Sequence, residues 1–147
     1  LDRDIYAFVY NDFLCQTQER AVVITAPNKE NRRPFPNSIR HLIPDYWKYF
    51  NFPDVAASLA PRPIIFPEGG LDRDFRLIQS AYDDCGKPEN VEFHHYPKFA
   101  DKTKRNDVEH LSEGLTPQAY FELVNVDPPS HYFKNELIIP WLHKILK

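Results

Sequence analysis

The sequence predicts a single α/β domain over residues 1–147 with parallel strands at its centre. Residues 62–66 contain a short apolar run, Ile64-Ile65-Phe66, in a stretch bounded by Pro and Gly, which is typical of a buried strand. An amphipathic helical pattern follows it, and a second strand-like run begins at Val91. A strand, a helix and a strand at this spacing form a β-α-β unit with parallel strands. The chain has 147 residues and 42% hydrophobic content, which is about one domain with enough apolar mass for a core.

The first strand is expected at residues 5–10, which are aromatic or β-branched apart from one alanine. It ends at Asn11 and Asp12, so a polar exit should lie at the carboxyl edge of the sheet. The apolar run at residues 21–24 is too short to distinguish a strand from the start of a helix.

Residues 26–52 combine several prolines with aromatic side chains. Proline at this density interrupts regular secondary structure, while the aromatic rings still need a surface on which to pack. We therefore expect an ordered, lid-like excursion over the edge of the sheet, which could form a wall of a pocket.

Two helices are expected around the central strand. Residues 52–60 have Pro53 near the first helical position, and Pro61 stops the helix. The second helix follows Asp72 and ends before Gly86. Its apolar residues recur with helical spacing at Leu71, Phe75, Ile78, Tyr82 and Cys85.

Two more helices are expected near the C-terminus. Thr116 and Pro117 have the character of an N-cap and a first helical residue. Residues 125–133 form a rigid turn that brings His131 to the start of the last helix. The apolar stripe of this helix consists of Phe133, Leu137, Trp141 and Ile145. Pro140 lies within that pattern, so the helix either begins later or kinks there.

Composition excludes several classes of protein. A net charge of −3 gives no electrostatic footprint for nucleic acid, and no apolar run reaches the about 18 residues of a membrane span. Residues 98–107 form a charged loop in which Lys102, Lys104 and Arg105 are expected to be solvated. Cys15 and Cys85 fit neither a zinc site nor a disulfide framework. Buried thiols are favoured over a bond between them.

The candidate catalytic residues are Asp72 and His131. Asp72 follows a core strand, and catalytic groups gather at the carboxyl ends of parallel strands. A carboxylate that orients an imidazole, which then acts as general base, activates a serine. Asp72 would be the acid, His131 the base and Asp74 the reserve acid. Alternatively, Asp72 or Asp74 only caps the next helix.

No serine is placed as a nucleophile. The four glycines, at positions 69, 70, 86 and 114, never flank a serine in G-x-S-x-G. In a hydrolase that combines such an elbow serine with an acid and a histidine, the groups that donate hydrogen bonds to the oxyanion come from segments before the strands present here. The chain lacks an initiator Met and begins abruptly, so we expect a piece of a longer polypeptide that is inactive alone.

Five segments of the chain resemble the C-terminal half of bacterial dienelactone hydrolase-like and acetyl xylan esterase-like α/β-hydrolases. The segments are residues 10–15 (YNDFLC), 34–38 (PFPNS), 52–63, 68–74 (EGGLDRD) and 128–134 (PPSHYFK). The resemblance covers nearly the whole chain and implies parallel strands six to eight of that fold with flanking helices. It implies that residues 69–72 carry the G-x-x-D acid and that His131 is the base.

The resemblance further implies an esterase acting on a carbohydrate ester, and export to the periplasm or the medium. It implies that the missing N-terminal half, or another chain, supplies the serine. No cofactor and no metal is expected, and neither nucleic acid nor a membrane is an expected partner.

Two other hypotheses stay open. His94, His95, His110 with Glu109, and His131 could form a metal site, but adjacent histidines on a strand point to opposite faces. The chain could also be a non-catalytic binding or scaffolding fragment that pairs with another chain through an exposed sheet edge.

Overall fold

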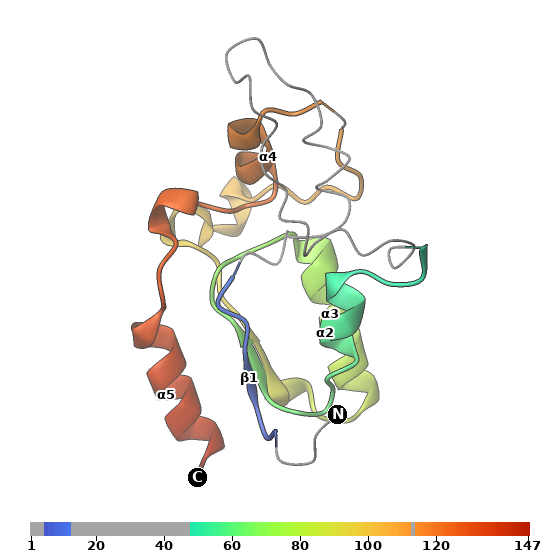
Figure 1. The fold of residues 1–147 in the computed structure, drawn as a ribbon, viewed down its shortest axis with the longest axis vertical. Coiled ribbons are helices and arrows are strands. Elements are labelled where there is room, and N and C mark those ends of the chain that lie inside the picture. The colour runs from blue at the N-terminus through green and yellow to red at the C-terminus, as the bar shows by residue number, and fades with distance from the viewer. Residues whose placement is uncertain (1–4, 13–47, 113) are drawn as a thin grey trace.

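The computed structural model describes residues 5–12, 48–112 and 114–147, which form an α/β fold (Figure 1). Its parallel sheet has the strand order β1-β2-β3, with β1 at Phe8–Val9, β2 at Ile64–Phe66 and β3 at Val91–Phe93. Ile64 of β2 is in register with Phe8 on one side and Val91 on the other. The predicted β-α-β unit is confirmed, although all three strands are shorter than the apolar runs suggested.

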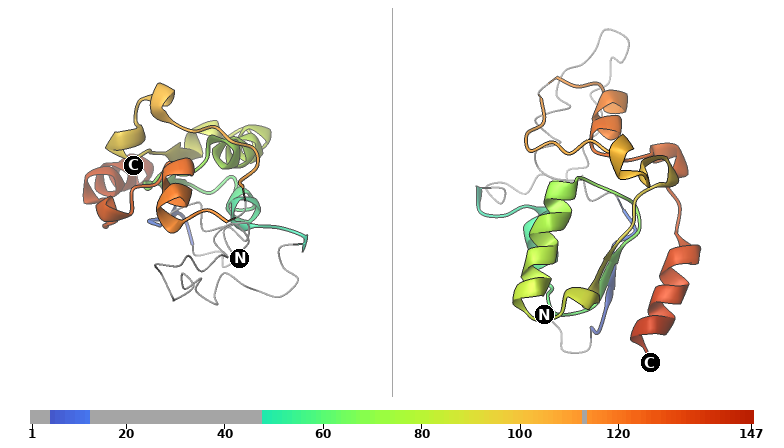
Figure 2. Two further views of the ribbon diagram at one scale, coloured as in Figure 1. Left: turned by 90° about the horizontal axis from the view of Figure 1, so that it is seen from above. Right: turned by 180° about the vertical axis from the view of Figure 1, so that it is seen from behind.

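Helices α2 (Phe52–Ala57) and α3 (Asp72–Asp84) lie on one side of the sheet. Figure 2 shows α5 (Asn135–Ile145) on the other side. Helix α3 buries Phe75, Ile78 and Tyr82 against the strands, as the helical spacing predicted. It ends just before Gly86, whose φ of 65° is the left-handed conformation of a helix stop.

The prediction of buried thiols is wrong for Cys85, which is exposed and free. Cys85 is the C-cap residue of α3, beyond the last helical turn. The other cysteine, Cys15, lies outside the described residues, as do the apolar run at 21–24 and most of the excursion at 26–52.

A second apolar cluster lies beyond the carboxyl ends of the strands. Helix α4 (Pro117–Leu123) supplies two of its aromatic side chains, and Thr116 caps that helix by accepting a hydrogen bond from the backbone of Ala119 at 3.2 Å. The buried members of the cluster are Leu71, Tyr96, Phe99, Tyr120, Phe121, Val124 and Val126. This cluster packs the segment between β3 and α5 onto the edge of the sheet.

The predicted buried stripe of the last helix is partly wrong. Helix α5 begins at Asn135, so Phe133 lies outside it and is 56% exposed. The side chains that α5 buries are Ile138 and Trp141. With about 3.6 residues per turn, a stripe spaced strictly by four residues drifts around the helix, which explains why Ile145 is only partly buried. Pro140 is exposed within the helix.

Among the described residues, no helix is both long and apolar enough to span a membrane.

Candidate active site

The carboxyl ends of β1 and β2 and the segment before α5 meet at one place. Two residues after β2 comes Glu68, and β1 is followed by Asn11 and Asp12. A short 3-10 turn at Pro128–Ser130 brings His131 to the same edge. Catalytic groups of open α/β sheets gather at this edge, because the connections there can vary without disturbing the core.

Glu68 and His131 form an acid–imidazole pair. Oε2 of Glu68 lies 2.6 Å from Nδ1 of His131, and Oε1 accepts a hydrogen bond from the backbone nitrogen of Tyr132 at 3.3 Å. The Glu68 side chain is 0% exposed, whereas the His131 side chain is 46% exposed. A carboxylate bonded to Nδ1 keeps the proton on that nitrogen, so Nε2 becomes the atom that can accept a proton.

The side chain of Asn11 ties the β1 exit to the segment that carries His131. Its Nδ2 donates to the carbonyl of Tyr132 at 3.2 Å, and its Oδ1 accepts from the backbone nitrogen of Lys134 at 3.0 Å. The prediction that the polar end of the first strand lies beside the site is confirmed. The backbone on both sides of Phe133 is thereby held to the sheet.

Lys134 places a positive charge next to the Glu68 carboxylate. Its Nζ lies 3.6 Å from Oε1 of Glu68, and only 5% of its side chain is exposed. The same nitrogen donates a hydrogen bond to the carbonyl of Ser130. Buried Glu68 therefore faces an imidazole at one oxygen and an ammonium group at the other.

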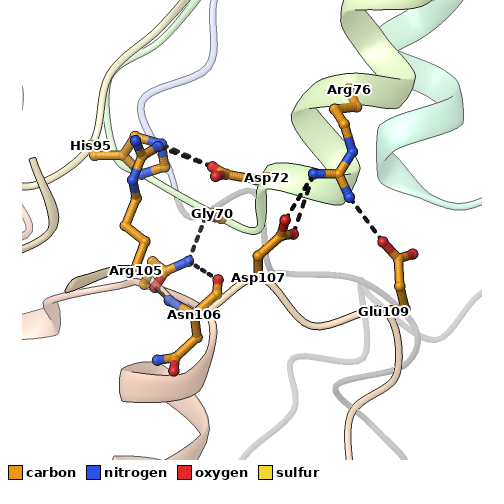
Figure 3. A network of polar contacts seen from close by, with 9 residues as sticks. Gly70, Asp72, Arg76, His95, Arg105, Asn106, Asp107 and Glu109 are labelled. Atoms are coloured by element: carbon orange, nitrogen blue, oxygen red, sulfur yellow. Dashed lines mark hydrogen bonds and ion pairs between the residues drawn. The ribbon is translucent and has the colours of Figure 1, made fainter. Parts of the chain in front are cut away.

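Asp72, the predicted acid, lies in a different cluster. Its Oδ1 is 3.2 Å from Nε2 of His95 and 3.1 Å from Nη1 of Arg105, as Figure 3 shows. The predicted pairing of Asp72 with His131 is therefore corrected, because the acid that contacts His131 is Glu68.

The turn between the two acids explains this difference. Gly69 has φ 69° and Gly70 has φ 149°, so the chain reverses immediately after Glu68. The backbone nitrogen of Gly69 donates to the carbonyl of His94 at 2.9 Å. After this reversal Asp72 is the first residue of α3 and faces the exit of β3.

The reserve acid Asp74 lies in the first turn of the same helix. It is 8% exposed, and its Oδ1 is 3.4 Å from Nε of Arg73. The alternative that Asp72 or Asp74 caps this helix is not borne out, because the N-cap of α3 is Leu71 and no side-chain cap hydrogen bond is formed there. The two acids lie in the first turn, where negative charge favours the helix dipole.

Arg105 is not the solvated residue that the charged loop suggested. Its side chain is 16% exposed, and its Nη1 lies 2.5 Å from Nε2 of His95 as well as beside Asp72. Burial lowers the pKa of His95, the positive charge of Arg105 lowers it further, and Asp72 acts in the opposite direction. On the surface beside it, Arg76 of α3 pairs with Asp107 and Glu109 (Figure 3).

The alternative of a metal site built on the adjacent histidines does not match their contacts. His94 pairs with Glu92 at 2.8 Å, while His95 pairs with Asp72, so the two rings have separate acids. The described residues do bring ligand atoms of Asp12, Glu68 and His131 within 4.8 Å of one another. A cation there would compete with the ammonium group of Lys134, so this arrangement favours acid–base chemistry over metal binding.

Comparisons with known proteins identify the family. The sequence profile of the Abhydrolase family matches residues 1–144. The chain belongs to the Abhydrolase family. Curated proteins yield no significant match.

A solved structure extends this Abhydrolase assignment. The chain is similar to a Bacteroides fragilis protein described as a "putative acetyl xylan esterase", with 65% sequence identity and a TM-score of 0.91. The match covers 100% of this chain and 38% of that protein. The resemblance to acetyl xylan esterase-like α/β-hydrolases is thus confirmed, and the chain spans well under half the length of this relative.

One residue of this candidate site, Glu68, is not among the residues that the sequence motifs indicate. Glu68 lies inside the segment that carries the family resemblance, but the G-x-x-D pattern drew attention to Asp72. The available signal was position, because Glu68 comes two residues after the apolar run and directly before two glycines. An acid at that point stays at the strand end, whereas an acid beyond the glycines enters the helix.

Proposed function

We propose that the chain supplies the acid and the general base of a serine hydrolase, with Glu68 as the acid and His131 as the base. The observation that carries this proposal is the 2.6 Å contact between a fully buried Glu68 carboxylate and a half-exposed His131 imidazole. The nucleophilic serine and the oxyanion donors come from outside this chain, because no serine here occupies an elbow motif.

The proposed reaction is ester hydrolysis through an acyl-enzyme. Nε2 of His131 takes the proton of the serine hydroxyl while the serine oxygen attacks the ester carbonyl. Glu68 stabilises the imidazolium that forms. His131 then gives the proton to the departing alcohol, and a water activated in the same way releases the acid. Each half of the reaction returns the imidazole to its neutral form.

The substrate class we propose is an acetyl ester on a carbohydrate. Its support is the 65% identity to a Bacteroides fragilis protein described as a "putative acetyl xylan esterase". A bacterial enzyme of this substrate class would meet its polysaccharide outside the cytoplasm, so we also propose a periplasmic or secreted location.

The test compares this chain with the complete polypeptide that contains it, using p-nitrophenyl acetate. We expect no turnover by the chain alone and clear turnover by the complete polypeptide. In the latter, His131→Ala should lower kcat by several orders of magnitude, since no group would then accept the serine proton.

Two results would contradict the proposal in different ways. Turnover by the chain alone that His131→Ala abolishes would show that the nucleophile lies within it. A complete polypeptide that lacks turnover, or that keeps it after His131→Ala, would favour the alternative of a non-catalytic binding or scaffolding fragment.

A further inference from the structure

We infer that Lys134 is a positioning residue that extends the working range of the hydrolase to lower pH, by holding a buried positive charge against Glu68. This inference rests on the proposed function, because it concerns how the Glu68–His131 pair takes up a proton. The Lys134 ammonium group contacts Glu68, the carbonyl of Ser130 and the ring of Tyr132, so its effect on the base would pass through Glu68.

The burial of Lys134 is the first observation. The residue is 4% exposed, whereas lysine is among the residues least often buried unless it is paired. Its Nζ lies 3.6 Å from Oε1 of Glu68 and 3.3 Å from the centre of the Tyr132 ring. It also donates to the carbonyl of Ser130. An acid, an aromatic face and a carbonyl thus replace the water that the ammonium group loses.

The second observation is that the two oxygens of the Glu68 carboxylate have different partners. Oε2 contacts His131, and Oε1 receives the backbone of Tyr132 and faces Lys134. The imidazole and the ammonium group therefore approach different oxygens and do not exclude each other. Because Lys134 is three residues after His131, one short segment carries both the base and the charge that balances its acid.

The consequence follows from charge alone. When the pair takes up a proton at low pH, the added positive charge is repelled by the ammonium group of Lys134 across the carboxylate. Without Lys134 the same proton is accepted at higher pH, and the general base is lost sooner on acidification. The direction of this change in pH is the same whether the proton resides on His131 or is shared with Glu68.

Other charged groups lie near the Glu68–His131 pair, and the test variant must leave them unchanged. Asp12 approaches from the β1 exit and adds negative charge. On the α5 side, Glu136 accepts a hydrogen bond from the Tyr132 hydroxyl at 2.6 Å. His94 and His95, from the β3 exit, line a cavity of about 290 Å³ that Lys134 also borders. Replacing only Lys134 leaves all of them in place.

The backbone of Lys134 is anchored independently of its side chain. Its nitrogen donates to Asn11 at 3.0 Å, and its carbonyl accepts the backbone nitrogen of Ile138 at 2.9 Å in the first turn of α5. Lys134→Met keeps an unbranched chain of similar length at this position and removes the charge. Lys134→Arg keeps the charge and changes the shape.

The experiment measures kcat/KM for p-nitrophenyl acetate from about pH 5 to about pH 9 in the complete polypeptide. For Lys134→Met we expect the midpoint of the acidic limb to move up by about one pH unit. For Lys134→Arg the midpoint should stay within a few tenths of a unit of wild type. Lys144→Met is the matched control, since Lys144 lies in the last turn of α5 with 62% of its side chain exposed, and it should leave the midpoint unchanged.

The outcomes separate the inference from the proposed function. If Lys134→Met lowers kcat/KM at every pH without moving the midpoint, Lys134 only supports the fold and the inference is overturned. If Lys134→Met does not fold, Lys134→Gln carries the same expectation, because its amide can still donate to Ser130. If wild-type turnover survives His131→Ala, the proposed function fails, whatever the lysine variants do.

Discussion

At the scale of single residues, two acids four positions apart have different surroundings. Glu68 is fully buried against His131, while Asp72 sits between His95 and Arg105. In the complete polypeptide we expect Glu68→Gln to lower kcat on p-nitrophenyl acetate by about 10³- to 10⁴-fold, because a neutral amide neither fixes the imidazole nor stabilises its charged form.

Asp72→Asn and Asp74→Asn are the matched comparisons for that measurement. Each removes one negative charge at constant size, and each should cost less than about tenfold in kcat, since neither acid contacts His131. Should either aspartate variant prove more damaging than Glu68→Gln, Glu68 would not be the acid of the triad.

Asn125 shows how one residue holds the connection around the site. It is fully buried with φ 59°, and its side chain bonds the backbone of Asn106 twice, at 2.8 Å each, and faces the carbonyl of Gly70 at 3.4 Å. We expect Asn125→Ala to lower the free energy of unfolding by about 2–3 kcal/mol, measured by urea denaturation.

Asn125→Gly separates the two causes of that loss. Glycine adopts positive φ without strain but makes none of the side-chain hydrogen bonds. If the bonds dominate, the glycine variant is nearly as unstable as the alanine variant. A glycine variant as stable as wild type would mean that backbone conformation alone explains the effect.

At the scale of elements, helix ends that carry a local capping signal were predictable, and buried faces were less so. The helix expected to continue to Pro61 instead ends at Ala57. Thr116 with Pro117, and Gly86 after an apolar stripe, signal helix ends through local chemistry that the sequence displays directly. The face that α5 buries depends on where its first turn begins. The residue before that turn, Lys134, donates its backbone hydrogen bond to Asn11, which is 123 residues away in sequence. The partner of His131 likewise depends on the reversal at Gly69 and Gly70, which fixes which acid stays at the strand end.

The N-cap of α4 gives a prediction at this scale. Thr116 accepts a hydrogen bond from the backbone of Ala119, and the helix that follows places Tyr120 and Phe121 in the second apolar cluster. Thr116→Ala should destabilise α4 by about 1 kcal/mol, seen as faster hydrogen exchange of the Ala119 and Tyr120 amides. Thr116→Ser keeps the acceptor oxygen and should exchange at nearly the wild-type rate; equally fast exchange in both variants would rule out the cap as the cause.

At the scale of the whole molecule, the cluster of Asp72, His95 and Arg105 couples stability to pH. Burial and Arg105 lower the pKa of His95 below its usual 6.5, so in the window below that value the unfolded chain binds more protons than the folded one. Stability from this group is therefore present at pH 7 and is lost as the pH falls through that window.

The measurement is the thermal midpoint of the complete polypeptide between about pH 7 and about pH 5. We expect the wild-type midpoint to fall on acidification and the fall to be smaller in His95→Gln, which has no proton to take up at that position. His143→Gln is the control, because His143 is exposed near the end of α5 and should leave the slope unchanged. If the thermal midpoint falls equally with pH in wild type and in His95→Gln, this cluster is not the cause of the pH dependence.

The crowding at Gly69 has a consequence for recognising related sequences. A methyl group built on Gly69 would come within 2.8 Å of the carbonyl oxygen of Asn125, and its φ of 69° already disfavours any side chain. A relative that carries a larger residue at this position must have displaced the strand-to-helix connection or the backbone at Asn125. A glycine directly after a glutamate is thus a simple marker for homologues that keep this acid at the end of the strand, and an alanine there would signal a remodelled site.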